Sequence, residues 1–223
     1  MNCIACLFAG AVVTSFALPA NALDIEKSGQ NEIFDNPFIA TGFNPQTRTL
    51  TGYVIGLRTE PGRTDECKFV FSGKVEKSGA MPLVLKSVPG STGSSEPTTA
   101  KGELLLSPKQ AQLVVDPKAL PGECEWILPN IGEPKVVQNG KKISLPIANS
   151  ETGAWIAVNA IAAKRAYFHK SADTASAGKA FLVAGDMVYV LEEKLEWLSV
   201  KYHGGKKDTV GWIKKADTVQ FSN

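Results

Sequence analysis

The sequence is poor in the residues from which metal sites and nucleophilic sites are built. Its 223 residues include two histidines, His169 and His203, and four cysteines. Zinc sites need three or four ligands at short, characteristic spacings, and neither HExxH nor a pair of neighbouring histidines occurs. The GxSxG pattern of a nucleophilic serine is also missing. We therefore expect no metal, no cofactor and no catalytic residue, and a protein that is not an enzyme.

The sequence also lacks a strong excess of charge of either sign. The formal net charge is +2, and charged residues make up 21% of the chain. Residues 164–223 carry ten Lys and Arg against seven Asp and Glu, whereas residues 23–163 carry fourteen against fifteen. Nucleic-acid backbones are bound by strongly basic surfaces. The composition therefore predicts no nucleic-acid partner.

Long apolar runs are missing except at the N-terminus. Residues 4–18 are mostly small or apolar, Pro19 follows, and Ala20-Asn21-Ala22 places small residues at the two key positions of a cleavage site. This pattern is typical of a signal peptide over residues 1–22, although no Lys or Arg precedes the apolar run. The alternative is a membrane anchor, for which the run is shorter than the roughly 20 residues required. We expect a periplasmic or secreted protein without a transmembrane segment in the mature chain.

Export also determines how the cysteines are interpreted. Cys3 and Cys6 have CxxC spacing, but they lie in the predicted signal peptide and are removed with it. Cys67 and Cys124 remain in the mature chain. Because two cysteines in an oxidising compartment tend to pair, we expect a disulfide between them, with two free thiols as the alternative.

Apolar residues at helical spacing are rare, and short runs of β-forming residues recur instead between Gly, Pro, Asn and Asp. Residues 67–75 alternate between two faces, and Asn139-Gly140 is a strong hairpin signal. Residues 124–128 and 155–161 are predicted as further strands. Roughly eight such runs predict a β-sandwich or small barrel over residues 23–163. The whole chain is therefore expected to be all-β.

The last 60 residues, 164–223, form a second predicted domain. An aromatic strand at Tyr167-Phe168 is followed by a polar loop, a turn at Gly185-Asp186, the strand EWLSVKY and a closing Gly211-Trp212. In this order these features resemble a bacterial SH3 domain. The resemblance implies a small five-stranded barrel, with Phe181 and Trp212 packed inside it.

The segment before this barrel resembles the N-terminal part of exported Gram-negative proteins that carry such a barrel at their end. The likeness rests on the run TGYV, the run CKFVFSG and the later single Cys124. It implies no particular activity.

Aromatic residues concentrate in the last third of the chain, and they suggest where a ligand binds. Tyr and Trp supply rigid contact area together with a polar group. We therefore predict a partly exposed groove on the barrel, with Tyr167, His169, Trp197 and Tyr202 as its ligand-binding residues.

Three functions remain open at this point. The first is a binding protein that engages a protein partner in the cell envelope, such as an inhibitor or immunity protein of a cell-wall-degrading enzyme. The second is a peptidoglycan-binding module. The third is an enzyme whose site is built from Asp, Glu and Lys in the first domain, which a deep cleft with perturbed carboxylates would indicate.

Overall fold

The structure is a computed structural model. It describes residues 25–32, 35–76, 79–89, 98–107, 110–120, 124–130, 137–139 and 142–221. The predicted signal peptide and Gly140 of the predicted hairpin turn lie outside these residues. Nearly all regular structure within them is β, so the predicted all-β fold class is confirmed. None of the described helices has the length and apolar character that a membrane crossing requires.

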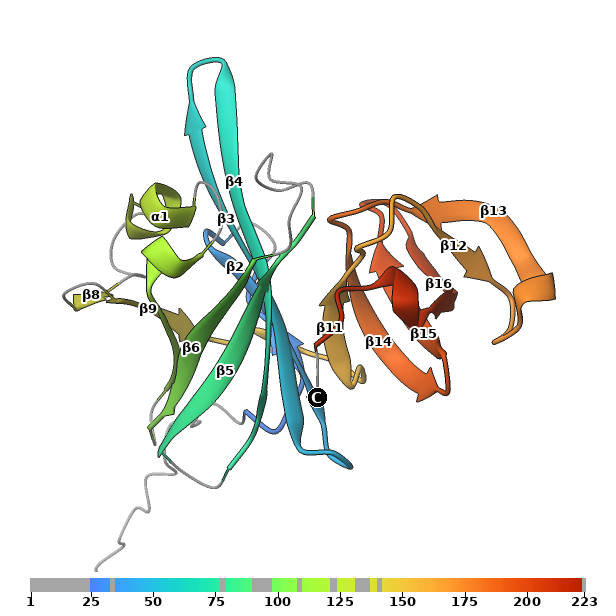
Figure 1. Cartoon of the computed structure of the whole chain (residues 1–223), viewed down its shortest axis with the longest axis horizontal. Helices are drawn as coiled ribbons and strands as arrows, with labels where there is room; N and C mark the ends of the chain where they lie inside the picture. Colours follow the sequence, from blue (N-terminus) through green and yellow to red (C-terminus); the bar gives the residue numbers. More distant parts are fainter. Residues whose placement is uncertain are drawn as a thin grey trace, which may run out of the picture.

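The first and larger sheet contains ten of the described strands, each antiparallel to its neighbours (Figure 1). Their order across the sheet is β10 (Glu151–Thr152), β1 (Gly29–Gln30), β2 (Phe38–Asn44), β3 (Thr49–Glu60), β4 (Arg63–Lys74), β5 (Gly79–Ser87), β6 (Thr99–Leu106), β7 (Ala111–Val115), β9 (Lys142–Ile147) and β8 (Val137–Asn139). From β2 to β7 each strand pairs with the next one in the chain, so this part is a meander.

The second, smaller sheet contains six described strands and lies beside β2 and β3 (Figure 1). Its order is β11 (Ala157–Ala160), β14 (Met187–Lys194), β15 (Trp197–His203), β16 (Asp208–Lys214), β12 (Ala166–His169) and β13 (Ala177–Leu182). Two 3₁₀ turns, η3 (Thr174–Ser176) and η4 (Lys215–Asp217), accompany it. Whether this sheet belongs to the SH3 family stays a prediction.

Alternation along the strands of the large sheet produces its core. On β4, Cys67, Phe69 and Phe71 are fully buried on one face, as the sequence pattern predicts. The sheet curls around these side chains and around leucines and isoleucines of β5, β6, β7 and β9. The opposite side of β4 is not left to solvent either, because Val70 is also buried there.

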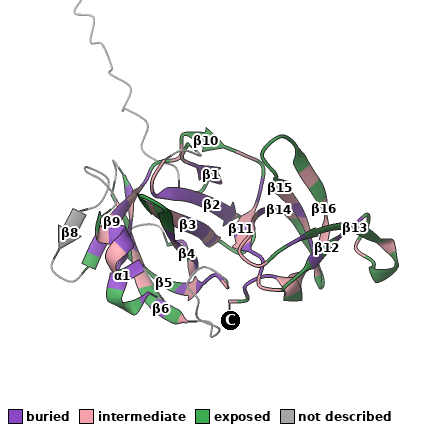
Figure 2. Cartoon of the chain, turned by 90° about the horizontal axis from the view of Figure 1, so that it is seen from above, coloured by how far each residue is buried: buried purple, intermediate pink, exposed green. Residues whose placement is uncertain are grey.

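The small sheet covers that second face. Phe38, Tyr53 and Val70 from the large sheet pack in one cluster with Trp155 and Tyr189. This explains why β2 is buried over almost its whole length (Figure 2). Strands that are apolar on both faces need cover on both sides.

The approach of the two sheets is close at β11. A Cβ atom on Gly42 of β2 would lie 2.4 Å from the backbone of Ala157, so only glycine fits there. The backbone N–H of Val158 donates a hydrogen bond to Oγ1 of Thr51 at 2.8 Å. β11 lies before the predicted domain boundary at residue 163, and yet it pairs with β14 of the small sheet. It therefore connects the two parts.

A disulfide joins Cys67 and Cys124, which confirms the predicted pairing. Cys67 lies in the middle of β4, and Cys124 begins the short helix α1 (Cys124–Ile127). The prediction of a strand over residues 124–128 is therefore wrong. A five-residue apolar run fits either a strand or one helical turn. Here the turn lets the bridge form while Ile127 and Leu128 enter the core.

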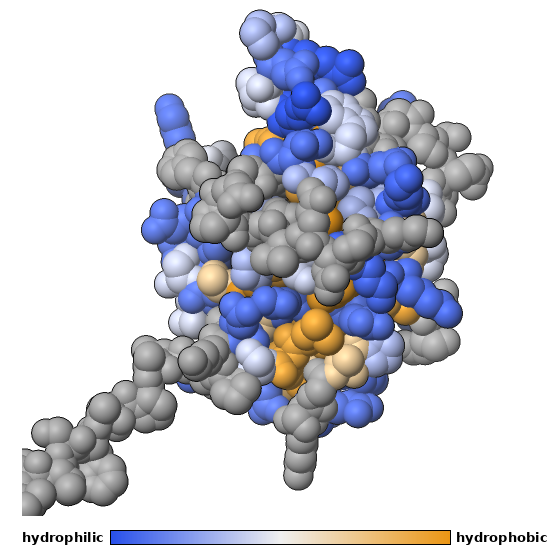
Figure 3. Space-filling model, turned by 90° about the vertical axis from the view of Figure 1, so that its left-hand side faces the viewer, coloured by the Kyte–Doolittle hydropathy of each residue, from blue (hydrophilic) through white to orange (hydrophobic). Residues whose placement is uncertain are grey.

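Two short 3₁₀ turns, η1 (Pro117–Ala119) and η2 (Leu128–Asn130), flank α1. The side of the molecule that carries this region is seen in Figure 3, where hydrophilic residues surround a small hydrophobic area.

Candidate binding cleft

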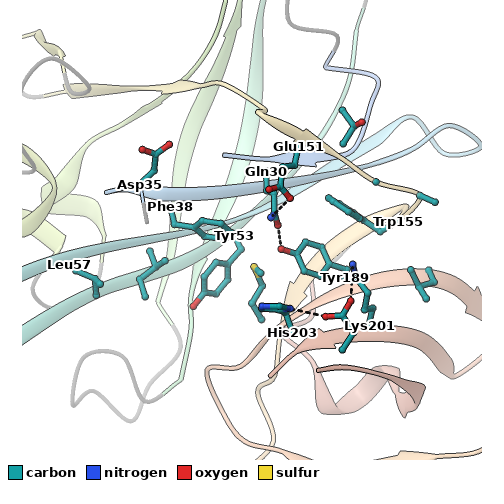
Figure 4. Close-up of a pocket in the computed structure, with 17 residues that line it drawn as sticks. Gln30, Asp35, Phe38, Tyr53, Leu57, Glu151, Trp155, Tyr189, Lys201 and His203 are labelled. Carbon is teal, nitrogen blue, oxygen red and sulfur yellow. Dashed lines mark hydrogen bonds and ion pairs between the residues drawn. The ribbon is translucent and has the colours of Figure 1, made fainter. Parts of the chain in front are cut away.

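A cleft of about 700 Å³ lies between the two sheets (Figure 4). The large sheet lines it with Phe38, Tyr53, Ile55 and Leu57, and the segment from Glu151 to Trp155 closes one side together with Gln30. The small sheet contributes Met187, Tyr189, Leu191, Lys201, His203 and Asp208. Asp35, at the start of the segment that leads into β2, completes the lining. Most of these side chains are aromatic or aliphatic, which is typical of ligand pockets.

Strand alternation directs the small-sheet side chains into the cleft. On β14, Val188 and Val190 point into the small sheet's own core, and Tyr189 between them faces the cleft. On β15 the same rule sends Lys201 and His203 to the cleft. The chemistry of this wall is therefore set by every second residue of β14 and β15, together with Asp208, which begins β16 opposite His203.

Two aromatic rings form the deep end of the cleft. The ring centroids of Trp155 and Tyr189 are 4.5 Å apart with the planes inclined by 52°. Nε1 of Trp155 donates a hydrogen bond to the carbonyl oxygen of Thr41 at 2.8 Å. The hydroxyl of Tyr189 donates to Oε1 of Gln30, and Nε2 of Gln30 donates to Glu151 at 3.2 Å. These contacts hold both rings in place without a ligand.

A small charged group lies beside these two rings on the same wall. Nζ of Lys201 is 5.2 Å from the centre of the Tyr189 ring and 5.6 Å from that of Trp155. The same ammonium lies 3.7 Å from Oδ2 of Asp208. Nδ1 of His203 is 2.7 Å from the other carboxylate oxygen. The hydrogen bond from His203, followed by the charge of Lys201, lowers the pKa of the Asp208 carboxyl.

Burial of Tyr189 predicts how the fold responds to alkaline pH. Burial, and to a lesser degree the charges of Glu151 and Asp208, raise the pKa of this phenol to about 12. In the unfolded chain the phenol ionises near pH 10, so its contribution to stability is present below pH 10 and is lost between pH 10 and 12. We expect the free energy of unfolding, measured in urea, to fall less from pH 9 to pH 11 in Tyr189→Phe than in the wild type. Equal losses would contradict this role of the buried phenol.

Three of the four predicted ligand-binding residues gather elsewhere, on the small sheet. Tyr167 is 40% exposed on β12. His169 is buried, and its ring centre lies 4.7 Å from that of Trp197 in an edge-to-face arrangement. Tyr167 and His169 line a second, shallower cleft of about 370 Å³ between η3 and η4.

Tyr202 does not join this group. It points to the face of β15 opposite to Lys201, against the core of the small sheet, with its hydroxyl 3.5 Å from Oδ1 of Asp186. Burial and the nearby Asp186 raise the pKa of the Tyr202 phenol. The four predicted residues therefore do not line one common groove.

The larger cleft was not predicted from the sequence, although one signal was available. Residues 187–191 are apolar at every position, and Met187, Tyr189 and Leu191 would need cover in addition to the buried Val188 and Val190. Such a strand indicates that a second element packs on its outer face. The pattern does not show which part of the chain supplies that covering element.

Within the described residues, no group of three or more His, Cys, Asp or Glu side chains is placed to hold a metal ion. The polar residues of the cleft pair with one another or with backbone, as described above for Gln30, Lys201 and His203. Comparison of the chain with family models, curated proteins and solved structures finds no match. The function must therefore be inferred from the clefts themselves.

Proposed function

We propose that this chain is an exported, non-enzymatic binding protein of the cell envelope, and that the cleft between its two sheets engages a protein partner. The observation that carries the proposal is the preformed aromatic floor made by Trp155 and Tyr189. Partners whose surfaces are already organised lose little conformational entropy on binding. The signal-peptide pattern over residues 1–22 and the Cys67–Cys124 bridge support an oxidising location outside the cytoplasm.

The composition of the cleft fits an inserted side chain or loop of a partner. Aromatic anchors in a desolvated pocket, with polar groups at the rim, are where protein interfaces concentrate their binding energy. Leu57 lies at the exposed rim, and Lys201 and Asp208 supply a charged contact at one end. Both sheets contribute lining residues, so a partner in this cleft would contact both parts of the chain at once.

The specific form that we propose is an inhibitor or immunity protein of a cell-wall-degrading enzyme. The support consists of the signal-peptide pattern, the disulfide and a cleft held by a β framework. An inhibitor of this kind needs no reaction of its own.

Leu57→Asp tests the proposal directly. A carboxylate in an apolar contact loses several kcal/mol of hydration, so we expect binding to weaken at least tenfold. Leu105→Asp on β6 is the matched control, because Leu57 and Leu105 are 38% and 37% exposed and only Leu57 lines the cleft. Immobilised protein should retain a hydrolase from periplasmic extract, and the soluble protein should block its action on purified sacculi.

The outcomes separate the parts of this proposal. Retention and inhibition by the wild type and Leu105→Asp, with loss in Leu57→Asp, would support it. Equal inhibition by both variants would exclude the cleft as the binding site. Recovery of peptidoglycan fragments alone would exclude the inhibitor.

A peptidoglycan-binding module is the second candidate, and the shallower cleft favours it. That cleft lies on the sheet whose sequence resembles bacterial SH3 domains, with Tyr167 exposed at its side. We propose that this sheet is an SH3-like barrel, a view supported by the β14–β15–β16 meander with η4 after its last strand. Co-sedimentation with purified sacculi at low salt tests the second candidate, and no retention would dismiss it.

A further inference from the structure

The small sheet ends in a strand with an open edge. β13 pairs with β12 on one side, and no described strand pairs with it on the other. Figure 1 shows β13 at the end of the molecule away from the large sheet. Five of its six residues are exposed, and Figure 2 shows them in green. Half of the backbone N–H and C=O groups of an edge strand point outward without a partner strand, so a further strand can add there.

The outward face next to this edge is apolar and aromatic. Tyr167 and Phe181 stand opposite each other on β12 and β13, with ring centres 5.7 Å apart. Phe181 is 41% exposed, and Val183 just after the strand is 46% exposed. The prediction that Phe181 packs inside the barrel is therefore wrong. An exposed aromatic pair beside an open edge provides contacts for the side chains of an added strand.

The charged side chains on the edge strand and in contact with its aromatic residue are basic. Cζ of Arg165 lies 4.7 Å from the centre of the Phe181 ring, and Lys179 is an exposed residue of β13 itself. Three acids lie in the same region: Asp173 accepts from the N–H of Ala175, Asp186 accepts from the N–H of Val183, and Asp217 lines the shallower cleft together with Arg165 and Lys214. Lysine on an edge strand discourages neutral and basic strands from pairing and favours acidic ones.

We propose that the open edge of β13 binds an extended acidic segment of a protein partner by strand addition. Main-chain hydrogen bonds supply the affinity. The Tyr167–Phe181 pair, Arg165 and Lys179 share one face, because residues two apart on a strand point the same way, and they select a partner strand that carries both acidic and apolar side chains on the face it turns to them. This second surface is independent of the cleft between the sheets.

A designed peptide serves as the probe. We use a fluorescent ten-residue peptide in which every second residue is Glu or Val in turn and the residues between them are Thr, so that Glu and Val share one face. A Lys/Val peptide of the same pattern and a Glu/Val peptide with N-methyl groups on four central residues serve as comparisons. Fluorescence anisotropy with the full mature protein should show the Glu/Val peptide binding at least tenfold more tightly than the other two. N-methylation removes backbone donors and blocks strand pairing while the side chains are kept.

Protein variants locate the site. Arg165→Glu combined with Lys179→Glu should weaken binding of the Glu/Val peptide at least tenfold. Lys101→Glu combined with Lys118→Glu is the matched control, since it changes the net charge equally at exposed positions of the large-sheet part. Leu57→Asp should bind the peptide like the wild type, so that failure of the cleft proposal and failure of this one can be told apart.

Hydrogen exchange provides the decisive readout. Added Glu/Val peptide should slow exchange of the amides of residues 177–182 and leave those of β3 unchanged. The proposal is overturned if the peptide does not bind, if the N-methylated peptide binds equally well, or if β13 gains no protection. Protection of β13 that rises with protein concentration alone would show instead that the edge pairs with a second copy of the chain.

Discussion

Replacing Cys67 and Cys124 together by alanine will lower the free energy of unfolding by about 4 kcal/mol. The bridge closes a loop with a sequence separation of 57 residues, and a crosslink of that length restricts the unfolded chain strongly. Both cysteines are fully buried in the core of the large sheet. Alanine removes the bridge without burying a hydroxyl group, which a serine would do.

Urea unfolding with and without reductant measures this effect. The oxidised wild type should be the most stable form, and the reduced wild type should resemble the double alanine variant. Reductant should leave the variant unchanged, which makes the variant its own control. If reductant does not destabilise the wild type either, the two thiols are not joined in the folded protein.

The sequence predicted the strands better than it predicted their surroundings. Alternation along β4 placed Phe69 and Phe71 on one face, which is the buried one, and the presence of two cysteines in a chain expected to be exported predicted the bridge. These are local patterns or rest on compartment chemistry. The short helix at Cys124–Ile127 was missed because a five-residue run carries no usable period.

The binding cleft could not be predicted because its contacts join distant parts of the chain. Gln30 and Tyr189, whose side chains hydrogen-bond in the cleft, are 159 residues apart. Neither residue lies in a recognisable motif. Phe181 was expected inside the barrel because large aromatic residues are usually buried, but β13 is an edge strand and its outward face has no covering element among the described residues.

The open edge and the cleft use different strands of the small sheet, because β14, β15 and β16 line the cleft and the edge belongs to β13. β11 and β14 face the large sheet, whereas β13 is the last strand on the other side. A partner at one place therefore leaves the other accessible, and the two proposals predict separate binding events. Binding in the cleft requires the two sheets to keep their relative position. Binding at the edge does not, because the edge belongs to the small sheet alone.

Trp155 belongs to the buried cluster that joins the two sheets, and Trp155→Ala should lower the free energy of unfolding by about 3–5 kcal/mol. The side chain is 7% exposed, packs on Tyr189 and donates to the backbone of Thr41, so its loss opens a cavity and removes a buried hydrogen bond. Trp155→Phe retains most of the apolar contact and should lose about 1–2 kcal/mol for the missing hydrogen bond and volume.

The half-buried Trp126 is the matched control, and its ring centre lies 4.6 Å from Cζ of Arg58. Trp126→Ala should lower the free energy of unfolding by less than Trp155→Ala does.

Hydrogen exchange shows whether the effect lies between the sheets. In Trp155→Ala the amides of β11 and β2 should exchange faster, because these strands face each other where Gly42 meets Ala157. The amides of β5 and β6, on the far side of the large sheet's core, should change little. Uniformly faster exchange in all strands would mean that the two sheets unfold as one unit, and Trp155 would then be an ordinary core residue instead of the link between two separately stable parts.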